Sequence, residues 1–135
     1  MRILALDIGE KRCGVAVSDA DGKVALPLCT LSTSEVLENS KTFQRILEDY
    51  EPVMLVCGLP VSLSGTENQQ AGIIREKAEQ IASLTKLPIE FIDERLSSSD
   101  ARRILRESGY DARTMRGKVD SIAASLLLQT FLESR

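Results

Sequence analysis

The apolar positions of the chain fall into short runs that predict strands, separated by stretches with helical spacing. Continuous runs at 3–6, 14–17, 53–57 and 89–92 are typical of strands. A further strand is expected at 23–31, because Asp21-Gly22 is a two-residue hairpin signal. Pro27 in its middle favours a sheet edge, whereas the wholly apolar run 53–57 favours a strand covered on both faces.

Helical spacing predicts helices from the caps at 32–34 to Tyr50, from Thr66 to Leu87, from Ser97 to Gly109, and from Gly117 to about Glu133. Thr66 with Gln69 forms a capping-box pattern, and 110–116 is a polar loop. The expected core positions of the first, second and last helix are Val36, Phe43, Ile46, Leu47 and Tyr50; Ala71, Ile74, Ala78 and Ile81; and Val119, Ile122, Ala123, Leu126, Leu127 and Phe131.

The order of these elements predicts an α/β fold with one five-stranded mixed sheet. Three consecutive strands would pair antiparallel, and two β-α units would add two parallel strands with helices on the faces. A chain of 135 residues is long enough for one compact domain, so we expect a single domain over 1–135.

Acidic residues stand where apolar segments end. Asp7 follows the first run, Asp93-Glu94 follows the last strand, and Asp120 lies in the first turn of the final helix. Each has a structural explanation: Asp7 in a turn before Gly9, Glu94 paired with Arg95, and Asp120 at a helix N-terminus. Together, at the strand ends where open sheets bind ligands, they suit Mg²⁺ or Mn²⁺, which prefer oxygen ligands.

Composition removes several classes of function. The chain has no histidine, which excludes Ser-His-Asp and Cys-His triads and zinc proteases with an H-E-x-x-H motif. With two Tyr, three Phe and no Trp, base stacking is a poor candidate for the main mode of nucleic-acid binding. The three cysteines are far apart and without C-x-x-C spacing, so neither a disulfide framework nor a zinc site is indicated.

Charge is unevenly distributed along a chain of net charge −3. The segment 95–118 carries seven Lys and Arg residues against three Asp and Glu, so a basic segment stands on an acidic body. That pattern favours gripping phosphates in one place, although a solvated helix face with a polar loop explains it as well. We find no signal-peptide pattern and no apolar run near the roughly 20 residues that span a bilayer, and we expect a cytoplasmic protein without membrane contact.

Four blocks of the sequence carry a resemblance: LALDIGEKRCGVAVSD, GLPVSLSGTENQQ, IDERLSSSDARR and GKVDSIAAS. In this order they closely resemble the YqgF type of bacterial RuvC-like proteins, which are described as Holliday-junction resolvases and as nucleases for the 5′ end of pre-16S rRNA. The likeness covers nearly the whole chain. It implies an RNase H-like fold whose catalytic and metal-ligating acids correspond to Asp7, Glu94 and Asp120.

Of the adjacent pair Asp93 and Glu94, the resemblance selects Glu94. Neighbours on an extended strand point to opposite sides, so Asp93 is a reserve. Two metal ions would activate a water and stabilise the leaving oxygen of a phosphodiester displacement, which requires no protein base and agrees with the missing histidine. The expected phosphate contacts, with the helix N-terminus at Thr66 as a backbone donor site, are Lys11, Arg12, Thr66, Arg95, Arg102, Arg103, Arg113, Arg116 and Lys118.

The sequence therefore predicts a metal-dependent nuclease for structured nucleic acid, acting in processing of the 5′ end of pre-16S rRNA with ribosomal precursor particles as partners. Resolution of Holliday junctions in DNA recombination and repair is the alternative, and a non-catalytic RNA or ribosome-assembly factor is another. Asp7-Ile8-Gly9 followed by Gly14 also resembles the phosphate loop of actin-like ATPases, which need two such domains. Monomer and dimer both stay open.

Overall fold

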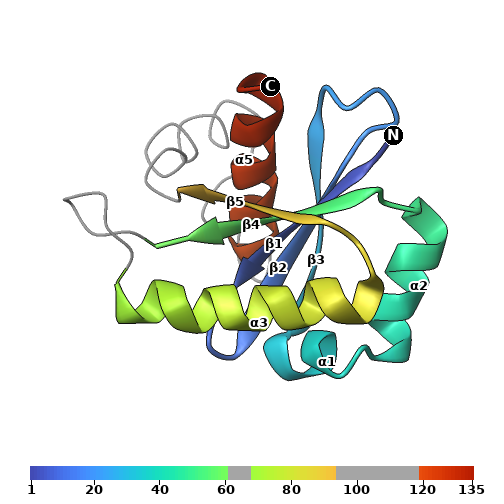
Figure 1. Ribbon diagram of the computed structural model, residues 1–135. Coiled ribbons are helices and arrows are strands. Elements are labelled where there is room, and N and C mark those ends of the chain that lie inside the picture. Colours follow the sequence, from blue (N-terminus) through green and yellow to red (C-terminus); the bar gives the residue numbers. More distant parts are fainter. Residues whose placement is uncertain (61–67, 94–118) are drawn as a thin grey trace.

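A computed structural model describes residues 1–60, 68–93 and 119–135 of the chain. Its strands are β1 (Ile3–Ile8), β2 (Arg12–Ser18), β3 (Ala25–Ser32), β4 (Met54–Leu59) and β5 (Ile89–Asp93). Its helices are α1 (Thr33–Leu37), α2 (Lys41–Tyr50), α3 (Gln69–Thr85) and α5 (Val119–Glu133) (Figure 1). The helix predicted at 97–109 and the basic segment 95–118 lie outside the described residues.

The five strands form one mixed sheet in the order β3-β2-β1-β4-β5. The pairs β1–β2 and β2–β3 are antiparallel, whereas β1–β4 and β4–β5 are parallel. This confirms the predicted topology of three antiparallel strands continued by two parallel ones. Pro27 lies in the edge strand β3, as predicted, where its missing N–H costs no hydrogen bond of the sheet.

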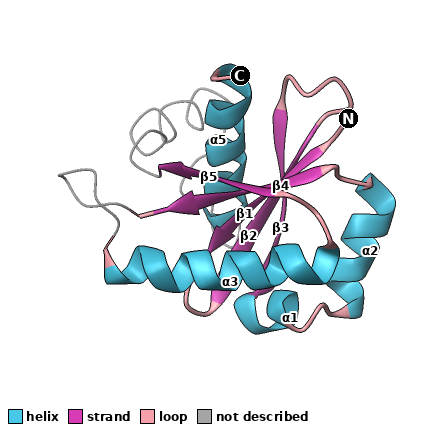
Figure 2. Ribbon diagram, viewed as in Figure 1, coloured by secondary structure: helices cyan, strands magenta, loops and turns pink. Residues whose placement is uncertain are grey.

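Helices cover both faces of the sheet (Figure 2), and the side chains of each strand alternate between these faces. Along β1, Leu4, Leu6 and Ile8 belong to the larger buried cluster, which also contains residues of α1, α2 and α3. Ile3 and Ala5 belong to a smaller cluster that contains Ala124 and Leu128 of α5. We call these two sides of the sheet the α3 face and the α5 face. The predicted α3 stripe of Ala71, Ile74, Ala78 and Ile81 is buried throughout, which confirms the pattern.

The helix predicted from 32–34 to Tyr50 is two helices, α1 and α2, so that prediction was wrong. Asn39 adopts a positive φ of 55°, which breaks the helix, and Ser40 then caps α2 by accepting a hydrogen bond from the Phe43 N–H. The predicted cap at Thr66 was also wrong. The cap of α3 is Asn68, whose side chain accepts from the N–H of Ala71 at 2.8 Å.

The predicted two-residue hairpin at Asp21-Gly22 is instead a longer connection between Ser18 and Ala25. Asp19 organises it, because its carboxylate accepts hydrogen bonds from the backbone N–H groups of Lys23 and Val24. Gly22 takes the left-handed conformation there, with φ of 69°. A local side-chain bond has therefore replaced the tight turn that the dipeptide favours.

The predicted apolar stripe of the last helix is only partly correct. Ile122 and Leu127 are buried, but Val119 is 59% exposed. The buried set includes the small residues Ser121, Ala124 and Ser125, which the stripe omitted. Apolar side chains occur around most of this helix, so its sequence does not identify the side that faces the sheet. No helix among the described residues combines the length and the apolar character that crossing a membrane requires.

Candidate metal and nucleic-acid site

Asp7 lies inside β1 rather than after its end, because the strand continues to Ile8. The prediction that the strand ends in this carboxylate is corrected accordingly. Alternation along β1 places Asp7 on the α5 face with Ile3 and Ala5, and the residue is partly buried among otherwise buried neighbours. Across the antiparallel pair, Asp7 is in register with Gly14 of β2.

Gly14 brings the N-terminal end of α5 against the same point of the sheet. A Cβ atom at Gly14 would overlap the backbone carbonyl of Asp120 and would lie 2.9 Å from the backbone nitrogen of Ser121. The missing side chain therefore permits a close approach of helix to strand. The structure thus gives Gly14 a definite role: Asp7 is in register with it on β1, and the backbone of Asp120 packs against it from α5. That these acids form a metal site with Glu94 stays a prediction.

Two further residues near Asp7 and Gly14 were not predicted from the sequence: Gly58 of β4 and Thr30 of β3. The parallel pairing of β1 and β4 ends at Leu6 with Cys57, and the next residue of β4, Gly58, is buried. Thr30 of β3 is in register with Gly14, and its hydroxyl oxygen is buried without a hydrogen-bond partner among the described residues. On the β2 side of Asp7, the missing side chain of Gly14 leaves room for the backbone of α5.

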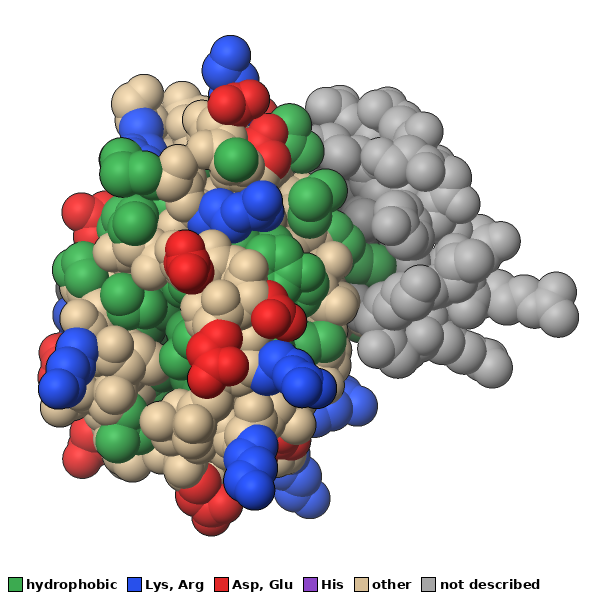
Figure 3. All heavy atoms as spheres, turned by 90° about the vertical axis from the view of Figure 1, so that its right-hand side faces the viewer, with side chains coloured by type: hydrophobic (Ala, Val, Ile, Leu, Met, Phe, Trp, Pro, Cys, Tyr) green, Lys and Arg blue, Asp and Glu red, His purple; other side chains and the backbone are tan. Residues whose placement is uncertain are grey.

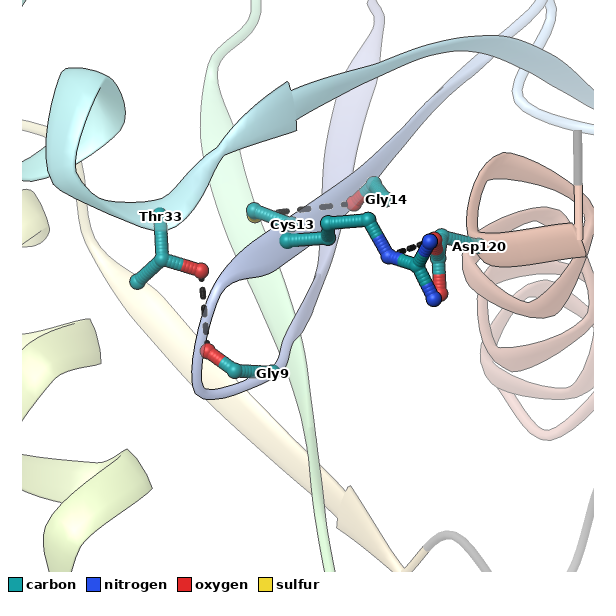
Figure 4. Close-up of polar contacts among 6 residues, drawn as sticks. Gly9, Cys13, Gly14, Thr33 and Asp120 are labelled. Carbon is teal, nitrogen blue, oxygen red and sulfur yellow. Dashed lines mark hydrogen bonds and ion pairs between the residues drawn. The ribbon is translucent and has the colours of Figure 1, made fainter. Parts of the chain in front are cut away.

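The turn between β1 and β2 is held by backbone bonds and by α1. The N–H of Gly9 donates to the Arg12 carbonyl at 2.8 Å, and a Cβ on Gly9 would lie 2.8 Å from that same oxygen. The hydroxyl of the buried Thr33 donates to the Gly9 carbonyl at 2.8 Å (Figure 4). The backbone N–H of Thr33 donates to the Lys11 carbonyl at 2.9 Å. Thr33 therefore fixes the turn that carries two predicted phosphate contacts, Lys11 and Arg12.

Arg12 contacts one of the predicted metal ligands. Its Nε lies 3.2 Å from Oδ2 of Asp120, and Figure 4 shows Asp120 at the start of α5 with this contact drawn as a dashed line. The Arg12 side chain is 75% exposed and that of Asp120 is 30% exposed. The prediction that Arg12 grips phosphate stays a prediction, and the structure adds a partner that the sequence did not reveal.

Cys13 reports on the charge around this site from the opposite side of β2. Burial raises the pKa of its thiol first of all, and neighbouring Cys57, Asp7, Cys29 and Asp120 raise that pKa further. Both acids therefore lie close enough to act on one sulfur atom. A thiol held in its protonated form is a poor metal ligand, which agrees with the absence of a cysteine zinc-site pattern in the sequence.

The residues at the end of β5 show which face of the sheet Asp93, the neighbour of Glu94, belongs to. Ile89 and Phe91 pack with the larger cluster, and the Arg75 guanidinium of α3 lies 4.4 Å from the centre of the Phe91 ring. Ile92 packs with the smaller cluster. Alternation therefore places Asp93 on the α3 face, opposite to Asp7, which counts against Asp93 as the reserve ligand.

Several predicted site residues lie outside the described residues, so the structure does not place them. They are Glu94, Thr66, Arg95, Arg102, Arg103, Arg113, Arg116 and Lys118. Within 1–60, 68–93 and 119–135, no group of three or more acidic, cysteine or histidine residues could hold a metal ion. On the described part of the surface in Figure 3, basic and acidic side chains are interspersed, and neither sign forms one broad patch.

Similarity to solved structures gives the fold class first. The structure of Thermus thermophilus RuvC in complex with a Holliday junction substrate superimposes with a TM-score of 0.60 at 14% identity, covering 100% of this chain and 95% of that one. The fowlpox virus resolvase in complex with Holliday junction DNA gives 0.58 at 16% identity, covering 99% and 98%. The fold is thus the RNase H-like fold of the RuvC-type resolvases, as predicted.

Sequence comparison gives the family. A family model described as "RuvX: Holliday junction resolvase" matches residues 1–134. A protein of Chloroflexus aurantiacus named "Putative pre-16S rRNA nuclease" is 36% identical over 133 residues, covering 98% of this chain and 87% of that protein. One of the same name from Anaeromyxobacter sp. is 38% identical over 135 residues, covering 100% and 98%. The chain belongs to the RuvX family of nucleases.

Proposed function

We propose that the chain is a divalent-metal-dependent nuclease that hydrolyses phosphodiester bonds in structured nucleic acid, with the 5′ end of pre-16S rRNA as its substrate. The observation that carries the proposal is the convergence of Asp7 and Asp120 on Gly14, from two segments more than a hundred residues apart. This arrangement brings an acid from a helix end and an acid from a strand to the same glycine, and two carboxylates there suit cation binding.

The described residues fit a hard divalent cation. Asp7 and Asp120 offer carboxylate oxygens, which Mg²⁺ and Mn²⁺ prefer, and Asp120 retains 30% exposure. Glu94 is proposed as the third ligand by its place in the family pattern. A cation held there supplies positive charge for a phosphodiester displacement and activates water at neutral pH. Lys11 and Arg12, on a turn fixed by Thr33, would hold the substrate phosphates beside these acids.

The test is a cleavage assay on two defined substrates with Mg²⁺, Mn²⁺ or EDTA. One substrate is an end-labelled RNA that carries the 5′ precursor segment of 16S rRNA, and the other is a four-way DNA junction. Asp7→Asn should reduce cleavage by at least about 100-fold, because an amide keeps the shape of the side chain but loses the charge that holds a cation. Asp21→Asn, which removes an exposed carboxylate from the distant hairpin, should retain wild-type rates.

Equal residual cleavage by wild type and Asp7→Asn would mean contamination and would remove the catalytic proposal. Urea unfolding of both variants shows whether a loss of activity reflects a loss of fold. Binding of the RNA that is equal with and without metal, together with absent cleavage, would favour a non-catalytic RNA or ribosome-assembly factor.

Resolution of Holliday junctions is the second candidate function. It is favoured by the name of the matching family model and by the two resolvases that share the fold. Phosphate and metal contacts are common to RNA and DNA, so the acids do not decide between them. Faster paired cutting of the four-way junction than of the RNA in the assay above would favour this candidate over rRNA processing.

A further inference from the structure

Arg12 combines exposure with a contact to a proposed metal ligand. Its Nε lies 3.2 Å from Oδ2 of Asp120, and its side chain is 75% exposed. A guanidinium has five N–H donors in a planar fork that matches a phosphate as well as a carboxylate. Arg12 can therefore pair with Asp120 and still present donors to solvent.

The contact between Arg12 and Asp120 is of a kind that exchanges easily. Ion pairs between side chains as exposed as these favour the paired state by no more than about five-fold, and salt screens them. A divalent cation brings twice the charge to the same carboxylate, and it repels the guanidinium. Occupation of Asp120 by a cation would thus release Arg12.

Hydrogen bonds fix the backbone of Arg12, whereas its side chain is 75% exposed and held by the contact with Asp120. Gly9 bonds to the Arg12 carbonyl, Thr33 bonds to Gly9 and Lys11, and β2 begins at Arg12. Release from Asp120 therefore moves only the side chain, and its guanidinium stays next to the acids. A phosphate brought to those acids would meet it there, as a charge-assisted and bidentate partner.

We propose that Arg12 alternates between two partners: Asp120 in the metal-free protein, and a nucleic-acid phosphate once a divalent cation holds Asp120. This inference rests on the proposed function, since it needs Asp120 to be a metal ligand. Its consequence is coupling: metal binding frees a phosphate contact, and by linkage nucleic acid then strengthens metal binding. The protein would bind its substrate most tightly when the divalent cation is bound.

The first measurement is Mn²⁺ affinity by titration calorimetry, with no nucleic acid present. Arg12→Gln removes the competitor for Asp120 and should tighten Mn²⁺ binding by about two- to five-fold. Lys11→Gln is the matched control, because it removes the same charge from the same turn without a described contact to Asp120. It should change Mn²⁺ affinity by less than about 1.5-fold.

The second measurement is binding of a labelled RNA hairpin by fluorescence anisotropy, in EDTA and in Ca²⁺, which is chosen to limit cleavage. Both variants should bind more weakly than wild type. The gain in affinity from EDTA to Ca²⁺ should fall by about two- to five-fold in Arg12→Gln and should be retained in Lys11→Gln. Because Arg12 is exposed, both variants are expected to fold.

The outcomes separate the inference from the proposed function. If Asp7→Asn loses Mn²⁺ binding but Arg12→Gln and Lys11→Gln behave alike, the proposed function stands and the alternation of Arg12 is overturned. If wild type and Asp7→Asn bind Mn²⁺ equally, the metal site fails and the inference fails with it. Tighter Mn²⁺ binding and weaker coupling between metal and RNA, found in Arg12→Gln but not in Lys11→Gln, would support both the inference and the proposed function.

Discussion

The two faces of the sheet are built by different rules. The α3 face packs large apolar side chains such as Leu4, Leu6 and Phe43, all fully buried, against α1, α2 and α3. The α5 face has a smaller cluster rich in alanine, and next to it lie Gly14, Gly58 and the acid Asp7. One face supplies apolar burial, and the other brings backbones close enough for polar side chains to meet.

This difference separates stability from the candidate chemistry. Changes on the α3 face should lower the free energy of unfolding and leave metal affinity intact in the molecules that fold. Changes around Gly14 should disturb the acids even where the loss of stability is moderate. Urea unfolding together with Mn²⁺ titration, applied to the same variants, tests the separation.

The largest loss of stability is expected from Phe43→Ala. Phe43 is a fully buried member of the α3-face cluster, and truncation of such a ring costs about 3–5 kcal/mol of unfolding free energy. Urea unfolding measures this loss. Mn²⁺ affinity, measured well below the unfolding transition, should stay at the wild-type value, and a weakened affinity would show that the two faces are coupled.

Gly14→Ala should follow, with a different signature. The added methyl would overlap the Asp120 carbonyl, so α5 must shift, and such overpacking costs about 1–3 kcal/mol. Because the shift moves Asp120 away from Asp7, the free energy of Mn²⁺ binding should fall by more than the free energy of unfolding. Titration calorimetry and urea unfolding give the two values.

Gly72→Ala is the control for that change. Gly72 lies inside α3, and nothing approaches its would-be Cβ within 4 Å. Alanine there should raise stability by about 0.5–1 kcal/mol, since glycine is a poor residue within a helix. Equal losses in Gly14→Ala and Gly72→Ala would contradict the close approach of α5 to β2.

The same contrast explains what the sequence could predict. Ala71, Ile74, Ala78 and Ile81 of α3 were predicted because one side of that helix meets a core and the other meets water. The same apolar pattern did not identify the buried side of the last helix, since Val119 is exposed and Ser121 is buried. The close packing of this helix against Gly14 favours small residues at the contact, and hydrophobic periodicity does not indicate where small residues are needed.

The candidate site divides in a similar way. Asp7 could be selected because a charge beside an apolar run is costly and local in sequence, whereas the ligand role of Asp120 came from the family resemblance. The contact of Arg12 with Asp120 and the bond from Thr33 to Gly9 join residues far apart in the chain, so no local pattern indicates them. The break at Asn39 was missed because a single left-handed residue interrupts otherwise helical spacing.

Thr33→Val tests how far the turn depends on α1. Valine keeps the shape of the buried side chain but removes the hydroxyl that donates to the Gly9 carbonyl, at a cost of about 1 kcal/mol. RNA binding should weaken as well, because the turn that carries Lys11 and Arg12 loosens. Thr33→Ser retains the hydroxyl and should bind RNA like wild type; equal weakening in both variants would assign the effect to packing.

The smallest effect concerns Asp19, far from the acids in the β2–β3 connection. Hydrogen bonds from the backbone N–H groups of Lys23 and Val24 hold the pKa of this carboxyl below its ordinary value of 3.8. Its contribution to stability is therefore complete above pH 3.8 and is lost as pH falls through the lowered pKa. Urea unfolding of wild type and Asp19→Asn between pH 3 and 6 should show curves that converge towards acid. Parallel curves would mean that these bonds do not favour the charged form.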